Sequence, residues 1–139
     1  MQKSQIVSMG YVKVKALLSD LEKKRSKEVE FLADTGAGYM VVTPDLAKDL
    51  GLEELARKLN LPKTRVTLAD KREVEAQQTF AYVSIMNREA PVTVLVMDCP
   101  MPLLGAFTLQ VLGLEVDPVT EKTKPSRPFS LGIMYLSAK

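Results

Sequence analysis

The sequence contains no histidine and a single cysteine, and both facts narrow the chemistry open to the chain. Without histidine, neither a Ser-His nor a Cys-His nucleophile can be built, and the usual zinc sites with histidine ligands are excluded. General acid–base catalysis would therefore fall to carboxylates. Because Cys99 is alone, no internal disulfide can form. This is typical of proteins in a reducing cytosol, so we expect a cytoplasmic location.

Long apolar runs and a strong charge imbalance are also missing. No run approaches the roughly 18 residues that would span a membrane, and the first residues lack the apolar stretch of a signal peptide. The net charge of +2 gives no reason to expect nucleic acid or an anionic membrane as a partner. The one basic cluster, residues 23–25 with Lys27, is flanked by glutamates, and we interpret it as a solvated hairpin tip.

The length and patterning predict one mostly β domain over residues 1–139. With 46% hydrophobic and 26% charged residues, the chain can bury a core of ordinary size. Alternation and turn signals predict strands over residues 11–18, 29–33, 39–42, 64–69, 73–86 (one bent strand or two), 91–97 and 114–117. Short helices are expected after Thr43-Pro44, over 53–59 and over 103–112. Residues 122–128 are expected to form a loop, and residues 129–136 a further strand.

The most informative segment is the tripeptide Asp34-Thr35-Gly36. The apolar run Phe31–Ala33 leads into it, and a second apolar run, Tyr39–Val42, leaves it. This pattern predicts a strand that delivers a lone carboxylate into a tight turn. An aspartate that merely hydrogen-bonds its own turn would give the same local pattern. The motif occurs once, so if Asp34 is catalytic, a second carboxylate is expected from another copy of the chain.

A second segment, Pro102–Val119, completes a recognisable combination. Asp34–Ala37 with its apolar flank resembles the active-site signature of retropepsin-like aspartic proteases. Pro102–Val119 is similar to the Leu-Leu-Gly, helix and x-Val-Asp-Pro segment of their small prokaryotic members. Residues 66–74 occupy the position of the family's flap. The resemblance covers about residues 10–120 and implies a closed β-barrel with one or two short helices, active as a homodimer.

The resemblance also implies a function and a set of site residues. The function is hydrolysis of peptide bonds in an extended peptide or unfolded protein, by a water molecule activated between two Asp34 carboxylates, without metal or other cofactor. Thr35 would hydrogen-bond across the dimer axis, and Gly36 would permit the tight turn. Substrate contacts would come from the turn and the flap, namely Ala37, Gly38, Leu68, Ala69 and Asp70.

Two positions depart from the family pattern. Gly38 stands where many members carry a polar side chain that contacts substrate backbone. Ala106 and Phe107 follow Gly105 where retroviral enzymes carry arginine and then aspartate or asparagine, so dimer contacts there would have to be apolar. We expect the C-terminal segment 126–139 to serve at the dimer interface. Deleting that segment and finding an intact dimer would refute this expectation.

Other interpretations are kept beside the protease. A catalytically weak or silent dimer of the same fold could bind peptide or mediate dimerisation, which Gly38 and the unusual helix segment allow. An actin-like ATPase also uses an Asp-Thr-Gly turn, but it needs two large α/β domains for which this chain is too short. Asp117-Pro118 is expected to be a turn and Cys99 a small packed residue rather than a nucleophile.

Overall fold

The computed structural model describes residues 12–68 and 70–129, which form nine strands and three short helices. The strands are β1 (Lys13–Ser19), β2 (Ser26–Asp34), β3 (Met40–Val42), β4 (Lys63–Thr67), β5 (Glu73–Ile85), β6 (Arg88–Val96), β7 (Leu103–Gly105), β8 (Leu114–Asp117) and β9 (Lys122–Pro125). The helices are α2 (Pro44–Asp49), α3 (Leu52–Lys58) and α4 (Ala106–Leu112). The predicted mostly β fold is confirmed.

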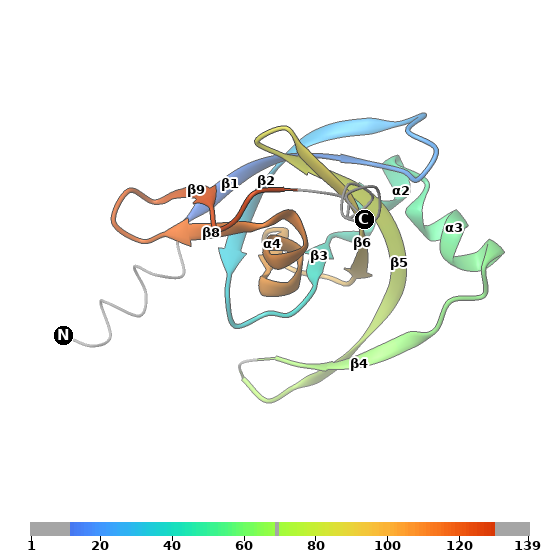
Figure 1. The fold of residues 1–139 in the computed structure, drawn as a ribbon. Coiled ribbons are helices and arrows are strands. Elements are labelled where there is room, and N and C mark those ends of the chain that lie inside the picture. Colours follow the sequence, from blue (N-terminus) through green and yellow to red (C-terminus); the bar gives the residue numbers. More distant parts are fainter. Residues whose placement is uncertain (1–11, 69, 130–139) are drawn as a thin grey trace, which may run out of the picture.

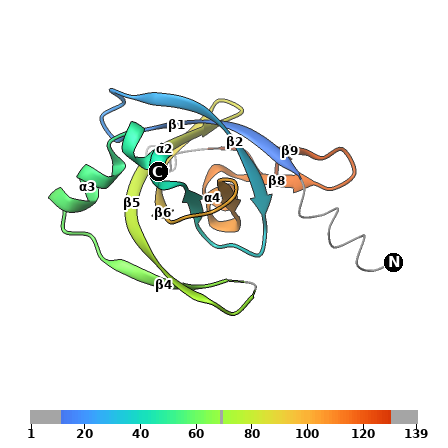
Figure 2. The same ribbon diagram turned by 180° about the vertical axis from the view of Figure 1, so that it is seen from behind.

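Six of the strands close into a barrel (Figures 1 and 2). The strand order is β1-β2-β7-β3-β6-β5, and β5 pairs back with β1 through Leu17–Ser19 to complete the circle. Strand β4 adds to the outer side of β5 as the other half of a hairpin. Strands β8 and β9 form a separate two-stranded sheet beside α4. Closure removes the exposed edges that an open sheet of six strands would leave.

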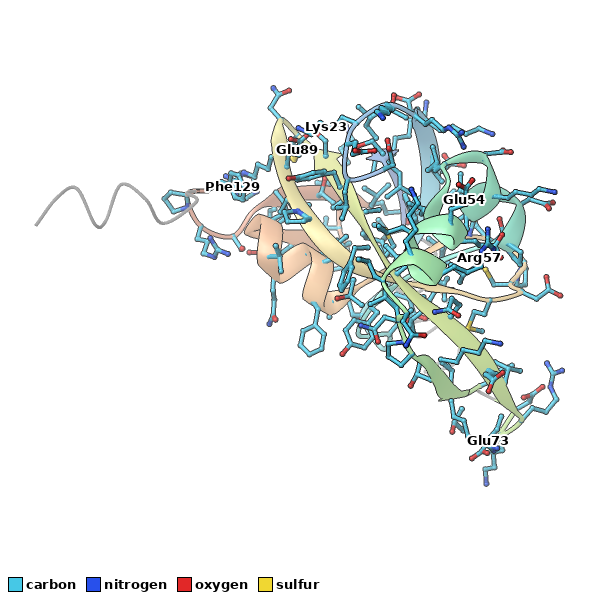
Figure 3. The ribbon with its side chains drawn as sticks, turned by 90° about the vertical axis from the view of Figure 1, so that its right-hand side faces the viewer. Lys23, Glu54, Arg57, Glu73, Glu89 and Phe129 are labelled. Atoms are coloured by element: carbon cyan, nitrogen blue, oxygen red, sulfur yellow. The ribbon has the colours of Figure 1, made fainter. Side chains whose placement is uncertain are left out.

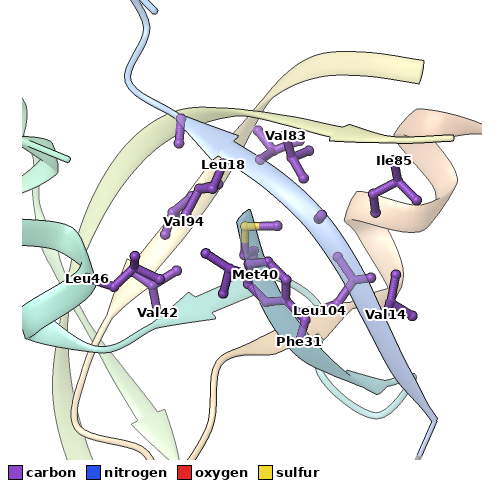
Figure 4. Packing of buried hydrophobic residues seen from close by; sticks show 14 of the residues in the cluster. Val14, Leu18, Phe31, Met40, Val42, Leu46, Val83, Ile85, Val94 and Leu104 are labelled. Atoms are coloured by element: carbon purple, nitrogen blue, oxygen red, sulfur yellow. The ribbon is translucent and has the colours of Figure 1, made fainter. Parts of the chain in front are cut away.

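The barrel is filled by side chains that alternate inward along its strands. Strand β2 shows the pattern clearly, because Val29, Phe31 and Ala33 are buried while the residues between them are more exposed. Phe31 meets Met40 and Leu104 in the centre of the barrel, where all three side chains are completely buried (Figure 4). Burial of such large side chains contributes roughly 2 kcal/mol each, so these residues anchor the strands on both sides of the candidate motif.

The start of α2 follows the predicted capping chemistry. The Thr43 hydroxyl accepts a hydrogen bond from the Leu46 backbone N–H at 3.3 Å, and Pro44 occupies the first turn. Gly51 has a left-handed backbone with φ of 72°, which separates α2 from α3 at little steric cost. Both helices lie together at one end of the barrel (Figure 1), away from the turn after β2.

Four local predictions need correction or completion. Residues 73–86 form one curved strand, β5, rather than two. The following turn is centred on Met86 and Asn87, both with positive φ, so residues 88–89 already belong to β6. Residues 103–105 are a strand rather than helix, because they pair with β2. Residues 122–125 form β9 rather than a loop, because they pair with β8. The predicted strand over 129–136 lies almost wholly outside the described residues.

Two arginines hold α4 against the rest of the domain. One Arg88 guanidinium nitrogen donates to the backbone oxygens of Leu112, Gly113 and Arg127 at 2.8–3.0 Å. Arg127 donates to the Gln110 backbone oxygen at 2.7 Å. These bonds satisfy carbonyls at the C-terminal end of the helix, where no intrahelical donor is available. The position of α4 is therefore fixed from the end that faces away from Asp34.

The exposed ends of the two long hairpins differ in character. Lys23, in the β1–β2 turn, forms an ion pair with Glu89, and the two side chains meet in Figure 3. This agrees with the solvated hairpin tip expected for the basic cluster. Glu73 lies near the far end of the β4–β5 hairpin, which extends well away from the barrel in the same view.

Candidate active site

Asp34 is the last residue of β2 and leads directly into a tight turn. Since Val29, Phe31 and Ala33 face the core, Asp34 faces the opposite side, where it is half-buried. One carboxylate oxygen, Oδ1, accepts a hydrogen bond from the Gly36 N–H at 2.9 Å. The Asp34 backbone oxygen accepts from the Ala37 N–H at 3.0 Å. The turn therefore fixes the carboxylate and leaves its second oxygen, Oδ2, available at the surface.

The N-terminal end of α4 lies directly behind this turn. The N–H groups of Ala106 and Phe107 donate to the backbone oxygens of Ala37 and Gly38 at 2.8 and 2.9 Å. Gly105 pairs with Asp34 in the parallel β2–β7 ladder. A Cβ atom at Gly105 would lie 2.4 Å from the Tyr39 backbone oxygen and 2.6 Å from that of Gly38. Only glycine fits there, and the helix supports the turn from below.

A cleft of about 740 Å³ opens in front of Asp34. One wall is the turn itself, through Gly36 to Tyr39, and the other is β4 with Leu68. Its floor belongs to a small apolar cluster, in which Val41, Leu95 and Met97 are buried and Val66, Leu68 and Leu103 pack against them. Asp34 is the one carboxylate among the described residues that line the cleft. The cleft therefore combines an apolar floor with one acid, Asp34, at the turn and one basic side chain, Arg65, on β4.

The tip of the β4–β5 hairpin bounds the open side of the cleft. Leu68 N–H donates to the Arg72 backbone oxygen at 2.8 Å, and Lys71 N–H donates to that of Leu68 at 2.9 Å. The Asp70 carboxylate accepts from the Arg72 side chain at 2.6 Å and is exposed. Ala69, predicted to contact substrate, lies outside the described residues. In both Figure 1 and Figure 2 the hairpin and the turn after β2 lie on the same side of the barrel.

The cleft thus gathers most of the residues singled out from the sequence. Asp34, Gly36, Ala37, Gly38 and Leu68 line it. Thr35 is exposed beside it, and Asp70 lies at the hairpin tip rather than on the cleft wall.

Sequence reasoning missed the apolar residues of the cleft floor and the aromatic pair beside it. Val41, Leu95 and Met97 looked like ordinary strand residues. Tyr39 and Phe107 pair at 5.7 Å between ring centroids, with both side chains about half exposed. Phe107 was noted only as a departure from a pattern, because nothing local in the sequence brings it beside Tyr39.

Two titratable groups that do not line the cleft, Cys99 and Asp117, have shifted pKa values. Burial, reinforced by the charge of Asp98, raises the pKa of the Cys99 thiol, so the thiol stays protonated at neutral pH and is a poor nucleophile. A hydrogen bond from the Val119 N–H lowers the pKa of Asp117, which is part of the β8–β9 turn. Among the described residues, no group of three or more acidic or cysteine side chains is placed to hold a metal ion.

The fold and site can now be compared with known proteins. The family model described as "Aspartyl protease" matches residues 20–116, which include the turn, the cleft, the β4–β5 hairpin and α4. The chain belongs to this aspartyl protease family. The expected resemblance is therefore confirmed at the level of the family, and a peptidase is the class of enzyme that the family contains. No curated protein sequence matches the chain.

Solved structures of retropepsin-like proteases share the fold. The EIAV protease, solved with the inhibitor HBY-793, superposes with a TM-score of 0.56 and 22% identity, covering 76% of this chain and 90% of its own chain. A retropepsin-like aspartic protease from Rickettsia conorii gives 0.55 and 24% identity, covering 76% and 75%. At this identity the likeness concerns the fold alone. No helix among the described residues is long and apolar enough to cross a membrane.

Proposed function

We propose that the chain is an aspartic endopeptidase that works as a homodimer, with one Asp34 from each copy at a shared site. The observation that carries this proposal is a single half-buried carboxylate, fixed by a tight turn at the edge of a cleft that no other described carboxylate lines. Peptide hydrolysis by carboxylates needs a base and an acid, so one copy alone is half a site. The exposed Thr35, next to Asp34, is available to bond with its counterpart across the axis.

The proposed mechanism follows from bringing two such carboxylates together. Because like charges a few ångströms apart cannot both ionise cheaply, the pair holds one shared proton. The ionised Asp34 takes a proton from water as the oxygen attacks the peptide carbonyl carbon, while the protonated Asp34 gives its proton to the carbonyl oxygen. In the second step, the Asp34 that took the proton from water gives it to the amide nitrogen as the C–N bond breaks. The other Asp34 takes a proton from a hydroxyl group of the intermediate, which becomes the carboxyl product. The carboxyl pair ends the cycle with the single proton with which it began.

The shape of the cleft indicates an extended peptide as substrate. The walls are a turn and a strand, and the apolar floor is formed by Val41, Leu95 and Met97. We propose that the β4–β5 hairpin acts as a flap, with Leu68, Ala69 and Asp70 near its tip. A flap of this kind pairs with an extended backbone as an added strand and excludes bulk water from the carboxylates. Folded proteins do not present such a strand, so unfolded segments are the expected substrates.

A silent dimer that binds peptide without cleaving it is the alternative, and Gly38 favours it. This residue lines the cleft but offers no side chain to grip substrate. Backbone groups of the turn and the flap would then have to hold the peptide alone. Residues 1–139 act as one domain in either case, and residues beyond 126 remain our proposed contribution to the dimer interface.

Digestion of an unfolded protein at a series of pH values tests the proposal. Reduced and alkylated casein incubated with the purified chain should be cleaved with a bell-shaped pH profile. Activity falls at low pH, because both carboxyls are protonated and no base remains, and at high pH, because the shared proton is lost and no acid remains. Mass spectrometry of the products gives the cleavage sites. A chain that binds casein at every pH but never cuts it would support the silent dimer instead.

A further inference from the structure

A second hollow lies beside the cleft and shares a wall with it. This outer hollow, of about 260 Å³, is lined by Tyr39, Pro91, Thr93, Phe107 and Val111 among others, none of them charged. Tyr39 lines both the cleft and the outer hollow, so the two form one continuous surface. The outer hollow therefore begins where the wall of the cleft ends.

The walls of the outer hollow are apolar side chains left unusually exposed. Tyr39, Phe107 and Val111 are 44%, 54% and 46% exposed, although residues of these types are normally far more buried. The Tyr39 and Phe107 rings are tilted by 55° relative to each other, an arrangement in which aromatic rings attract one another. Covering these side chains with an apolar group of a ligand would remove apolar surface from water and so favour binding.

The outer hollow is also fixed rigidly to the catalytic turn. Phe107 N–H donates to the Gly38 backbone oxygen at 2.9 Å, and a Cβ atom on Gly38 would already touch the Phe107 ring at 3.4 Å. The glycine at position 38 thus leaves the ring uncovered on the side facing the cleft. The position of the hollow relative to Asp34 is set by backbone hydrogen bonds rather than by a mobile loop.

We propose that the outer hollow is a distal subsite that takes a large apolar side chain of the substrate, several residues from the bond that is cut. This inference rests on the proposed function. An extended peptide advances about 3.3 Å per residue, so a chain held at Asp34 continues past Tyr39. Lysine, arginine, aspartate and glutamate side chains are disfavoured there, since no charged partner lines the hollow. A symmetric dimer carries one such hollow at each end of the cleft.

The test uses peptides built on the strongest site of casein cleavage. The peptides are made in pairs that differ at one position, where one member carries phenylalanine and the other lysine. The varied positions run from the second to the sixth residue on each side of the bond that is cut. Wild type is expected to prefer phenylalanine at one outer position by about tenfold in kcat/KM. Val111→Ser should reduce that preference to about twofold without lowering cleavage of the lysine peptide. Phe107→Ser should reduce the preference in the same way, and its total activity is read together with its oligomeric state, because dimer contacts were also expected at this position. Leu59→Ser is the matched control, because Leu59 is 52% exposed at the end of α3 and lines neither hollow nor cleft.

Two further measurements separate the possible failures. Sedimentation of each variant shows whether Phe107→Ser dissociates the dimer, in which case the hollow is an interface between copies and the subsite is refuted. Equal cleavage of phenylalanine and lysine peptides at every outer position, with cleavage still dependent on Asp34, overturns the subsite and leaves the protease intact. If wild type cuts nothing, no cleavage site defines the peptides, so the test becomes binding of labelled alanine-rich peptides that carry one phenylalanine or one lysine to Asp34→Asn, measured by fluorescence anisotropy. A phenylalanine preference then upholds the subsite while the protease fails, and no preference overturns both.

Discussion

Asp34→Asn is expected to remove cleavage of casein, lowering kcat by about a thousandfold or more, while the protein stays folded and keeps the oligomeric state of wild type. The amide cannot take a proton from water, so the shared site loses its base. The turn should survive, because the asparagine Oδ1 can still accept the hydrogen bond that Asp34 Oδ1 accepts from Gly36 N–H at 2.9 Å. Loss of activity would then report chemistry rather than unfolding.

The matched control is Asp49→Asn. Asp49 is exposed at the end of α2, where its carboxylate lies 3.4 Å from the Lys27 ammonium. An exposed ion pair of this kind contributes little, so activity should change by less than about twofold. Circular dichroism and thermal unfolding of both variants confirm that the fold is retained. Undiminished cleavage by Asp34→Asn would mean that another group, or a contaminant, does the work.

Gly105→Ala is expected to destabilise the domain by about 3 kcal/mol and to abolish most activity. The new methyl group would lie 2.4 Å from the Tyr39 backbone oxygen and 2.6 Å from that of Gly38. Neither oxygen belongs to a flexible side chain, so either α4 or the turn after β2 must move. Such a shift disturbs the hydrogen bonds from Ala106 and Phe107 that support the turn. Denaturant unfolding measures the stability, and casein digestion measures the activity.

Gly38→Ala provides the contrast in stability. Its new methyl group meets only the edge of the Phe107 ring at 3.4 Å, an ordinary contact. The free energy of unfolding should therefore change by no more than about 0.5 kcal/mol. If Gly105→Ala proves as mild as Gly38→Ala, then α4 does not constrain the turn as described.

The sequence was most informative where local chemistry and tertiary structure agree. The Thr43-Pro44 helix start and the alternation of β2 could both be predicted, because caps and period-two burial act over a few residues. The tight turn at Asp34 belongs to the same class.

The errors arose where pairing with a distant strand overrides local spacing. Residues 103–105 have helical spacing but pair with β2, some 70 positions earlier in the chain. Residues 122–125 look like a linker and are held by β8. For the same reason, the cleft floor and the Tyr39–Phe107 pair could not be foreseen, since no local pattern records which strands the barrel brings together.

The central claim is that two copies of Asp34 form one site, and mixing wild type with Asp34→Asn tests it most directly. Equal amounts are combined, allowed to exchange subunits, and assayed on casein at constant total protein. If both carboxylates are required, only dimers of two wild-type copies are active, so about one quarter of the wild-type activity should remain. Retention of about one half would mean that each copy works alone, and would contradict the account.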